Sequence, residues 1–211
     1  MERSTHLREE FGGGSLTSLP IVETEAGNIS AYIPTNIISI TDGQIYLSTS
    51  QFQKGILPAI DTGKSVSRVG GDAQLPAYSA LVGRLKLFYS QFEELESFAK
   101  FGTQLDKETE RRLNRGRAIR SVMKQIQYRP IHVVEQIAIL MATNKGLLDN
   151  LNDEQKKFAI EKIRASVRTD YPEIVDKILD RKKLKDDDKA ILLDGFKKML
   201  KQEGLNLSSE E

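Results

Sequence analysis

The chain contains no cysteine and only two histidines among its 211 residues. The absence of cysteine excludes disulfides and thiolate metal sites, and it is typical of a protein from a reducing compartment. His6 and His132 lie far apart and have no carboxylate at ligand spacing. We therefore interpret both as surface or satisfied core residues, and we expect no metal site.

A dominant charge and a long apolar run are also absent. The chain has 31 Lys and Arg against 30 Asp and Glu, a net charge of +1, so no overall field attracts nucleic acid or anionic lipid. No apolar run is long enough to span a membrane, and the charged start at residues 1–4 is not a signal peptide. We expect no nucleic-acid partner, and a membrane to matter only through partner proteins.

A complete phosphate-binding loop is missing as well. Gly63-Lys64-Ser65 matches the end of G-x-x-x-x-G-K-[ST], but the first glycine would then stand at position 58, which is Pro58. Such loops lead into a helix whose N-terminus holds the phosphate, and residues 66–71 cannot begin a good helix. The chain therefore has no nucleotide-phosphate cradle of its own.

What this stretch does contain is Arg68, a single arginine followed by Val69, Gly70 and Gly71. The glycines allow a sharp turn, and the planar guanidinium offers five donors that match phosphate oxygens. From spacing alone, we favour the interpretation that Arg68 is a solvated surface residue. The functional alternative is that it binds an anion such as phosphate.

Residues 1–73 have a pattern typical of an α/β fold. We expect a buried strand over Leu16 to Thr24, and a strand over Gln44 to Leu47 after the Asp42-Gly43 turn. Ser39 lies in the apolar run before that turn, and by spacing alone it is a core serine bonded to backbone. A charged short helix over residues 2–10 and a helical turn closed by Gly55 complete this part.

After residue 73 the periodicity becomes helical, and we expect five or six helices packed as a bundle. One helix should begin near Pro76 and end at Gly102. A second begins after Asp106, an apolar helix follows over Val133 to Met141, and Asn152 with Gln155 forms a capping box for the next. One apolar stripe marks the first helix: Leu81, Leu85, Phe88, Phe92, Leu95 and Ala99.

The second helix carries a basic face, which is more typical of a solvated or carboxylate-paired surface than of nucleic-acid binding at this net charge. Its members are Arg111, Arg112, Arg115, Arg117 and Arg120. Pro172 and the charged run at 181–189 separate the last amphipathic helices, and the tail at 208–211 is expected to be disordered.

Three runs carry a resemblance to a known family. They are GGGSLTSLPIVETEAGNISAYIPTNIISITDGQIYL at 12–47, PAIDTGKSVSRVGGDAQ at 58–74 and FGTQLD at 101–106. The chain resembles the α subunit of F-type ATP synthases, and the resemblance weakens after Leu148. Asn28, Leu57, Lys64 and LPAY at 75–78 are more similar to the sodium-translocating branch of that family.

The resemblance implies a fold in two parts. Residues 1–73 would be the end of a RecA-like domain of the P-loop NTPase class, and residues 74–211 a helical C-terminal domain. The Walker A half of the family chain does not precede the matched region, so we expect a fragment, a cleavage product or a split-gene product. Its residues 16–47 would then have unpaired strand edges and an exposed apolar face.

The resemblance also implies roles for individual residues. Arg68 matches the family's arginine finger, which reaches across a subunit interface to nucleotide on the β subunit, and Ser39 matches a serine that borders the same site. Gln125, Gln127 and Phe52 match the adenine pocket of a non-catalytic nucleotide site. Leu57 stands where many members have arginine. The loop from Gly102 to Asp106 would face the central stalk.

By the same resemblance, the chain would support ATP synthesis or hydrolysis coupled to proton or sodium translocation, with no activity alone. ATP or ADP with Mg²⁺ would be shared ligands, since the phosphate loop and Mg²⁺ ligands are absent here. The partners would be the β, γ and δ subunits and the peripheral stalk, at the cytoplasmic face of a bacterial inner membrane or its organellar equivalent. The alternative is a non-catalytic assembly or regulatory module that docks on the ring or stalk. A free-standing nucleotide-binding protein using Gln125 and Gln127 is disfavoured by the missing phosphate loop.

Overall fold

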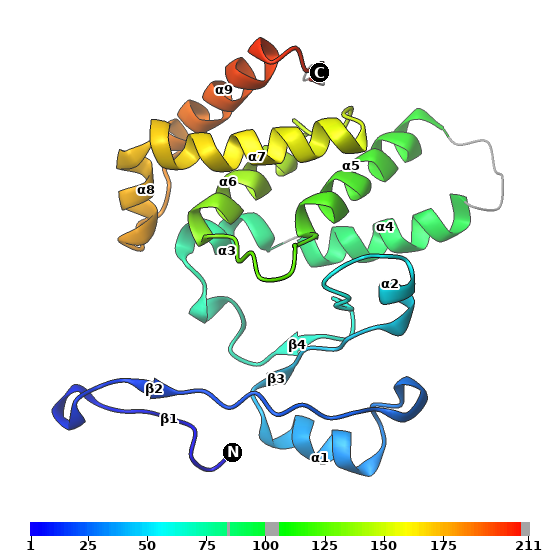
Figure 1. Ribbon diagram of the computed structural model, residues 1–211, viewed down its shortest axis with the longest axis vertical. Coiled ribbons are helices and arrows are strands. Elements are labelled where there is room, and N and C mark those ends of the chain that lie inside the picture. Colours follow the sequence, from blue (N-terminus) through cyan, green and yellow to red (C-terminus); the bar gives the residue numbers. More distant parts are fainter. Residues whose placement is uncertain (84, 100–105, 208–211) are drawn as a thin grey trace.

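A computed structural model describes residues 1–83, 85–99 and 106–207. Within these ranges, seven helices, α3 to α9, make up the second part of the chain, from residue 74 on. The first part, residues 1–73, is extended and lies on one side of these helices (Figure 1). The predicted helix end at Gly102, the loop after it and the tail at 208–211 lie outside the described residues.

The helical part contains more helices than the five or six predicted. The single helix expected from Pro76 is two helices in the described residues, α3 and α4, so that prediction was wrong. The predicted helix starts at Pro76, Asp106 and Asn152 are confirmed. The bounds are α3 Pro76–Val82, α4 Leu85–Ala99, α5 Lys107–Met123, α6 Val133–Asn144, α7 Asp153–Asp170, α8 Pro172–Leu179 and α9 Asp186–Gln202.

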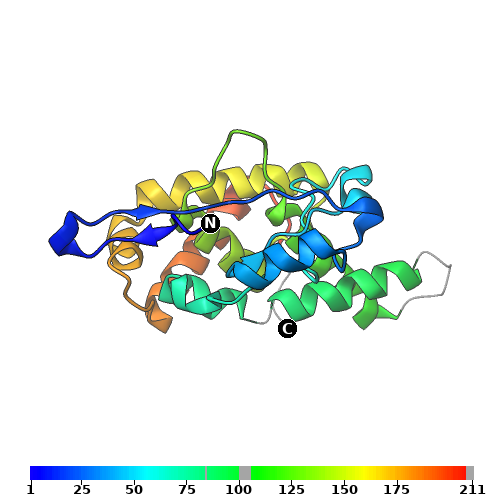
Figure 2. The ribbon, with the colours of Figure 1, turned by 90° about the horizontal axis from the view of Figure 1, so that it is seen from below.

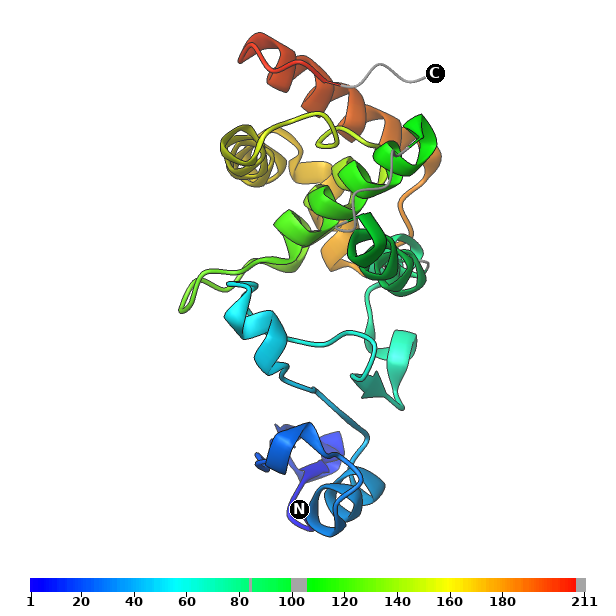
Figure 3. The same cartoon turned by 90° about the vertical axis from the view of Figure 1, so that its right-hand side faces the viewer.

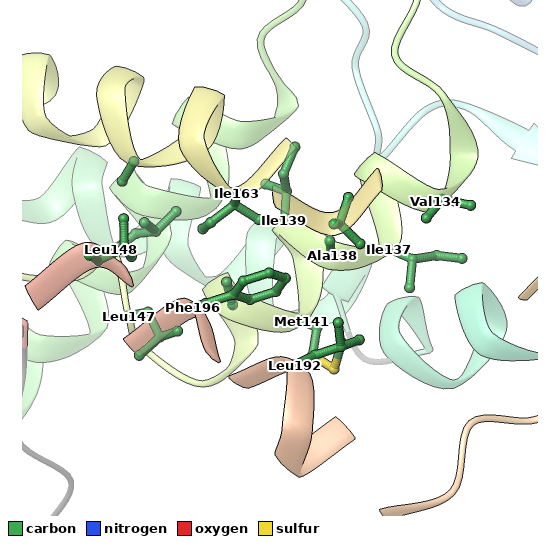
Figure 4. Packing of buried hydrophobic residues seen from close by; sticks show 14 of the residues in the cluster. Val134, Ile137, Ala138, Ile139, Met141, Leu147, Leu148, Ile163, Leu192 and Phe196 are labelled. Atoms are coloured by element: carbon green, nitrogen blue, oxygen red, sulfur yellow. The ribbon is translucent and has the colours of Figure 1, made fainter. Parts of the chain in front are cut away.

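Helix α6 lies at the centre of the bundle. It packs against α3, α5, α7, α8 and α9, and nine of its twelve residues are buried, as expected for a largely apolar helix inside a bundle. Ile137 and Ala138 are buried, as are their neighbours Ile163 of α7 and Phe196 of α9 (Figure 4). The predicted apolar helix at Val133 to Met141 is therefore the core helix of this domain.

A smaller apolar cluster joins α4 to α5. Phe92 of α4 packs with Leu113 and Ile119 of α5, as the apolar stripe predicted. Gly116 lets the two helices approach, because a Cβ there would overlap the Phe92 ring and lie 2.6 Å from its Cε2 atom. Arg120 closes the cluster with its guanidinium carbon 4.6 Å from the Phe92 ring centroid.

The first part of the chain is held by short elements. Strand β1 (Thr5–His6) pairs with β2 (Ser15–Leu16), and β3 (Gly43–Gln44) pairs with β4 (Val66–Ser67), both antiparallel. Helix α1 spans Tyr32–Ile40 and α2 spans Thr49–Gln53. Short 3₁₀ turns lie at Glu9–Phe11, Glu25–Gly27 and Gly70–Ala73. Figure 2 shows α1 and the β1–β2 hairpin from below.

Three predictions for this part were wrong. The buried strand at Leu16 to Thr24 is absent apart from Leu16, and Leu19 and Ile21 are 81% and 98% exposed. Pro20 lacks the N–H that a strand interior needs. The strand at 44–47 is reduced to Gln44, with an isolated bridge from Leu47 to Ile60. The segment at 2–10 is a strand and a 3₁₀ turn, without an α-helix.

No apolar core stabilises the first part: in residues 1–73, all of which the structure describes, Pro34 alone is buried. The segment lies beside the helical bundle (Figure 3) and is bound to it by hydrogen bonds. Gln51 Nε2 donates to Glu93 Oε1 at 2.8 Å, and Lys86 Nζ donates to the Ser65 carbonyl at 3.0 Å. The backbone N–H of Gln125 donates to the Leu57 carbonyl at 3.0 Å.

The α4–α5 contact gives a testable prediction. Gly116→Ala should lower the free energy of unfolding by about 1–3 kcal/mol, because the new methyl group overlaps a buried ring. Urea denaturation followed by helical circular dichroism measures this. Gly83→Ala is the matched control, since its Cβ would be 3.7 Å from the nearest atom in a helical backbone. An equal loss in both variants would contradict the packing role of Gly116.

Candidate functional site

Arg68 stands at the end of β4 and its side chain is exposed. The ladder of β3 and β4 pairs Gly43 with Ser67, directly before it. The backbone N–H of Arg68 then donates to the Asp42 carbonyl at 2.7 Å. The backbone of Arg68 is thereby fixed to the segment that follows α1, although the residues lie far apart in sequence.

The guanidinium of Arg68 rests on the C-terminal end of α1. Its Nη1 donates to the Ser39 carbonyl at 3.3 Å and its Nη2 donates to the Ile38 carbonyl at 3.4 Å. Carbonyls in the last turn of a helix have no partner within the helix, and they carry the negative end of its dipole. A cation is therefore favoured here, and the planar fork is oriented by two acceptors.

Ser39 is thus placed beside Arg68, as two residues of one site would be. The predicted core position was wrong, because Ser39 is exposed. Its predicted bond to backbone is present, since the hydroxyl donates to the Asn36 carbonyl at 2.7 Å. The spacing argument failed because residues 37–40 form the last turn of a surface helix with no sheet around it.

The predicted nucleotide residues lie at the junction between the two parts. Gln125 lines a cleft of about 220 Å³ with Gln136 and Tyr78, and burial raises the pKa of the Tyr78 hydroxyl. Gln127 and Phe52 are exposed, Phe52 by 66%. Apolar side chains complete the cleft: Leu85, Val122, Met123, Ile131, Ile139 and Leu140.

Leu57 is joined to this region through its backbone. Its carbonyl accepts the hydrogen bond from the N–H of Gln125, while the Gln125 side chain donates to the Arg129 carbonyl at 3.2 Å. Figure 3 shows the loop after α5 beside the loop that carries α2. The structure thus brings Gln125 to the segment after Phe52, with a leucine rather than a charged residue at position 57.

Asp106 begins helix α5. Its carboxylate accepts a hydrogen bond from the Thr109 N–H at 2.6 Å, which is the geometry of an N-cap. This bond to Thr109 lowers the pKa of Asp106 below its ordinary value. Gly102, the other residue predicted to face a stalk, lies outside the described residues.

The basic face of α5 is engaged within the chain. Arg120 makes two bonds to the Glu96 carboxylate, at 2.7 and 2.8 Å, and a third to the Tyr89 hydroxyl at 3.2 Å. Burial opposes the charge of Arg120, but these bonds raise its pKa. Arg115 pairs with Asp149 at 3.1 Å. Carboxylates of α4 and of the turn between α6 and α7 therefore pair with these two arginines.

One cluster of charged groups was missed by the sequence analysis. Glu135 of α6 is buried, and it accepts hydrogen bonds from Arg164 Nε at 2.7 Å and Arg168 Nη1 at 3.2 Å. With Glu161 and Ala165 they line an open cleft of about 260 Å³. The sequence shows that Arg164 and Arg168 are one helical turn apart on α7, but it does not show that Glu135 of α6 pairs with both of them.

In the described ranges, no three side chains of the His, Cys, Asp and Glu types are grouped so that they could hold a metal ion. Among the helices that the structure describes, none is long and apolar enough to cross a membrane.

Comparison with known families matches both parts of the chain. The ATP synthase alpha/beta family nucleotide-binding domain matches residues 1–67. The C-terminal domain of the ATP synthase alpha/beta chain matches residues 74–199, where the helical bundle lies. The chain therefore belongs to the ATP synthase alpha/beta family.

Individual relatives narrow this to the C-terminal portion of an alpha subunit. ATP synthase subunit alpha 2 of Syntrophus aciditrophicus (strain SB) is 58% identical over 194 residues, covering 92% of this chain and 37% of that protein. ATP synthase subunit alpha 1 of Rhodopirellula baltica is 62% identical over 155 residues, covering 74% and 31%. The chain thus spans about a third of the length of these curated relatives. The predicted resemblance is confirmed, and so is the helical C-terminal domain.

The N-cap of α5 gives a prediction that depends on pH. Because the folded pKa of Asp106 is lowered, its carboxylate stabilises the fold above the ordinary Asp pKa, and this is lost as the pH falls through the lowered value. Asp106→Ala should lower the thermal midpoint at neutral pH, and the two midpoints should converge on acidification. Asp106→Asn keeps an acceptor and should stay near the parent at neutral pH. A difference between parent and Asp106→Ala that persists in acid would contradict this assignment.

Proposed function

We propose that this sequence, within an assembled ATP synthase ring, supplies Arg68 as an arginine finger to a nucleotide on the neighbouring β subunit. The observation that carries the proposal is the placement of Arg68. It is exposed, beside Ser39, and its guanidinium is held by two backbone carbonyls. Its other N–H donors have no acceptor among the residues that the structure describes.

The chemistry needs only this arginine from the chain. Charge spreads over the transferring phosphoryl group in the transition state, and a guanidinium that stays ionised offsets it through paired N–H donors. Ser39 borders the same site across the subunit interface. The reaction is ATP synthesis or hydrolysis coupled to translocation of protons or sodium ions by other subunits.

The second part of the proposal is a share in a non-catalytic nucleotide site. Gln125, Gln127 and Phe52 would contact the adenine of ATP or ADP. An amide can both donate to and accept from the base edge, and the aromatic ring can pack on its face. The cleft supports the assignment for Gln125, because it combines amide groups with apolar walls, whereas Gln127 and Phe52 do not line it.

The Mg²⁺ that accompanies the nucleotide finds no fitting ligand set here, since the described residues hold no cluster of metal-ligand side chains. We derive no step through the ion from this chain. The proposed partners are the β subunits of the ring, the γ subunit facing Gly102 and Asp106, and the δ subunit with the peripheral stalk. The proposed location is the cytoplasmic face of a bacterial inner membrane, as a peripheral part of the complex.

A second candidate is a non-catalytic assembly or regulatory module that docks on the ring or stalk. The observation that favours it is the exposure of apolar side chains in a segment without a core. Leu19, Ile21 and Tyr32 are 81%, 98% and 82% exposed, and surfaces of this kind are covered by other proteins.

The finger is tested in a ring whose α subunits carry this sequence. Arg68→Ala should lower kcat for ATP hydrolysis about 10³–10⁵-fold while the ring still forms. Arg68→Lys should show most of this loss, because an ammonium keeps the charge and loses the fork. Steady-state kinetics and native mass spectrometry of the same preparation measure both properties.

Arg117→Ala is the control. Arg117 is an exposed arginine bound to the Asn114 side chain at 3.3 Å, and its removal should change kcat less than about threefold, as for an ordinary surface substitution. A ring that assembles and hydrolyses ATP at the parental rate with Arg68→Ala would exclude the finger. The docking module would then be the better assignment.

A further inference from the structure

We propose that Gly43 is a positioning residue for Arg68. It acts as part of a three-residue joint, Thr41, Asp42 and Gly43, which directly follows α1 in the chain and contacts Ser67 and Arg68. The inference rests on the proposed function of Arg68, and it names the residues that set the place and angle of its guanidinium. No side chain of the joint reaches the nucleotide in this proposal. Asp42 and Gly43 contact the backbone of Arg68 and Ser67, and the Thr41 hydroxyl holds these residues to the end of α1.

Each residue of the joint makes a different contact. The Thr41 hydroxyl donates to the Ile37 carbonyl at 2.9 Å and also lies 3.1 Å from the Gly43 carbonyl oxygen, so it ties the joint to the end of α1. The Asp42 carbonyl accepts from the N–H of Arg68. Gly43 pairs with Ser67 in the ladder. The helix end and the arginine backbone are thus linked within three residues.

Gly43 is the member that admits no other residue. Its φ of 146° lies in a region that side chains rarely adopt. A Cβ at this position would overlap the Val66 carbonyl oxygen and lie 2.9 Å from the Ser67 Cα. Both obstacles are backbone atoms of β4, so neither can rotate away. Any side chain at position 43 must therefore displace β4, the strand that directly precedes Arg68.

The displacement matters because the guanidinium is positioned from two directions. Its backbone is fixed by Asp42, and its side chain is fixed by the carbonyls of Ile38 and Ser39. These contacts use two of the five N–H donors and fix the plane of the fork. The other donors have no acceptor among the residues that the structure describes. A shift of β4 would move the backbone of Arg68 relative to the Ile38 and Ser39 carbonyls, to which its guanidinium is bonded.

The test compares Gly43→Ala with Gly71→Ala in the assembled ring. Gly71 lies three residues after Arg68, its φ is not in the left-handed region, and its Cβ would be 3.6 Å from Ser79 Oγ, an ordinary contact. A misplacement of about 1 Å at a catalytic group costs about 10²-fold. We expect Gly43→Ala to lower kcat about 10²-fold with KM changed less than about threefold, and Gly71→Ala to leave both near parental values.

A double-mutant cycle separates positioning from general damage. In an Arg68→Ala background, Gly43→Ala should cost nothing further, because the group that it positions is already absent. An equal cost in both backgrounds would overturn the inference. So would parental kcat for Gly43→Ala in a ring where Arg68→Ala alone is slow. If Arg68→Ala is itself silent, the proposed function fails instead, and the two failures are therefore distinguishable.

A milder variant covers the case in which Gly43→Ala prevents assembly. Thr41→Val removes only the hydroxyl that ties the joint to α1 and keeps the side-chain shape. Thr35→Val is its control, since the Thr35 hydroxyl donates to the Ile29 carbonyl at 3.3 Å at the other end of the helix. We expect Thr41→Val to lower kcat about tenfold in an assembled ring, well below the cost of a full misplacement, and Thr35→Val to have no effect. Equal kcat in the two threonine variants would overturn the inference.

Discussion

The burial of α6 on every face is the constraint on which the helical domain depends. Helix α6, Val133–Asn144, has twelve residues, and nine of them are buried, so most of its surface must be covered by other helices. Five other helices of the chain supply the cover. The one buried carboxylate on it, Glu135, is neutralised by arginines of α7, because an uncompensated charge at such depth is costly. The fold of residues 74–207 follows from surrounding this one element.

The first 73 residues are stabilised differently, and Arg68, the residue on which the proposed function depends, lies among them. They bury almost nothing, so backbone hydrogen bonds and a few contacts to the bundle define their shape. In such a segment, the conformation depends strongly on the glycines that allow close backbone approach and on the carbonyls at helix ends. The seat of Arg68 on the carbonyls of α1 is made from these parts alone, and it leaves the guanidinium at the surface. The proposed finger role would require an arginine that is oriented and yet exposed, and Arg68 is exposed with its guanidinium bonded to two backbone carbonyls.

Sequence reasoning succeeded where the signal was periodic or local. The largely apolar α6, the stripe with Phe92, the capping box at Asn152 and the proline at the start of α3 were each readable, because helices are specified by near neighbours. It failed at Leu16 to Thr24, where a strand was inferred from composition although a strand needs paired neighbours to exist. It also placed Ser39 in a core. Arg68 contacts the backbone carbonyls of Ser39 and Ile38, which lie 29 and 30 residues earlier in the chain. Because these contacts are to backbone atoms, the spacing of side-chain types in the sequence does not reveal them. The family resemblance, not the pattern, singled out these two residues.

The most direct test of the account is a cryo-electron microscopy structure of the assembled ring, with nucleotide bound and α subunits that carry this sequence. The account predicts a guanidinium nitrogen of Arg68 within about 3 Å of a terminal phosphate oxygen on the neighbouring subunit. It also predicts that the Ile38 and Ser39 carbonyls remain bonded to the same guanidinium. Arg68 directed into solvent, with no nucleotide phosphate within reach of its side chain, would contradict it.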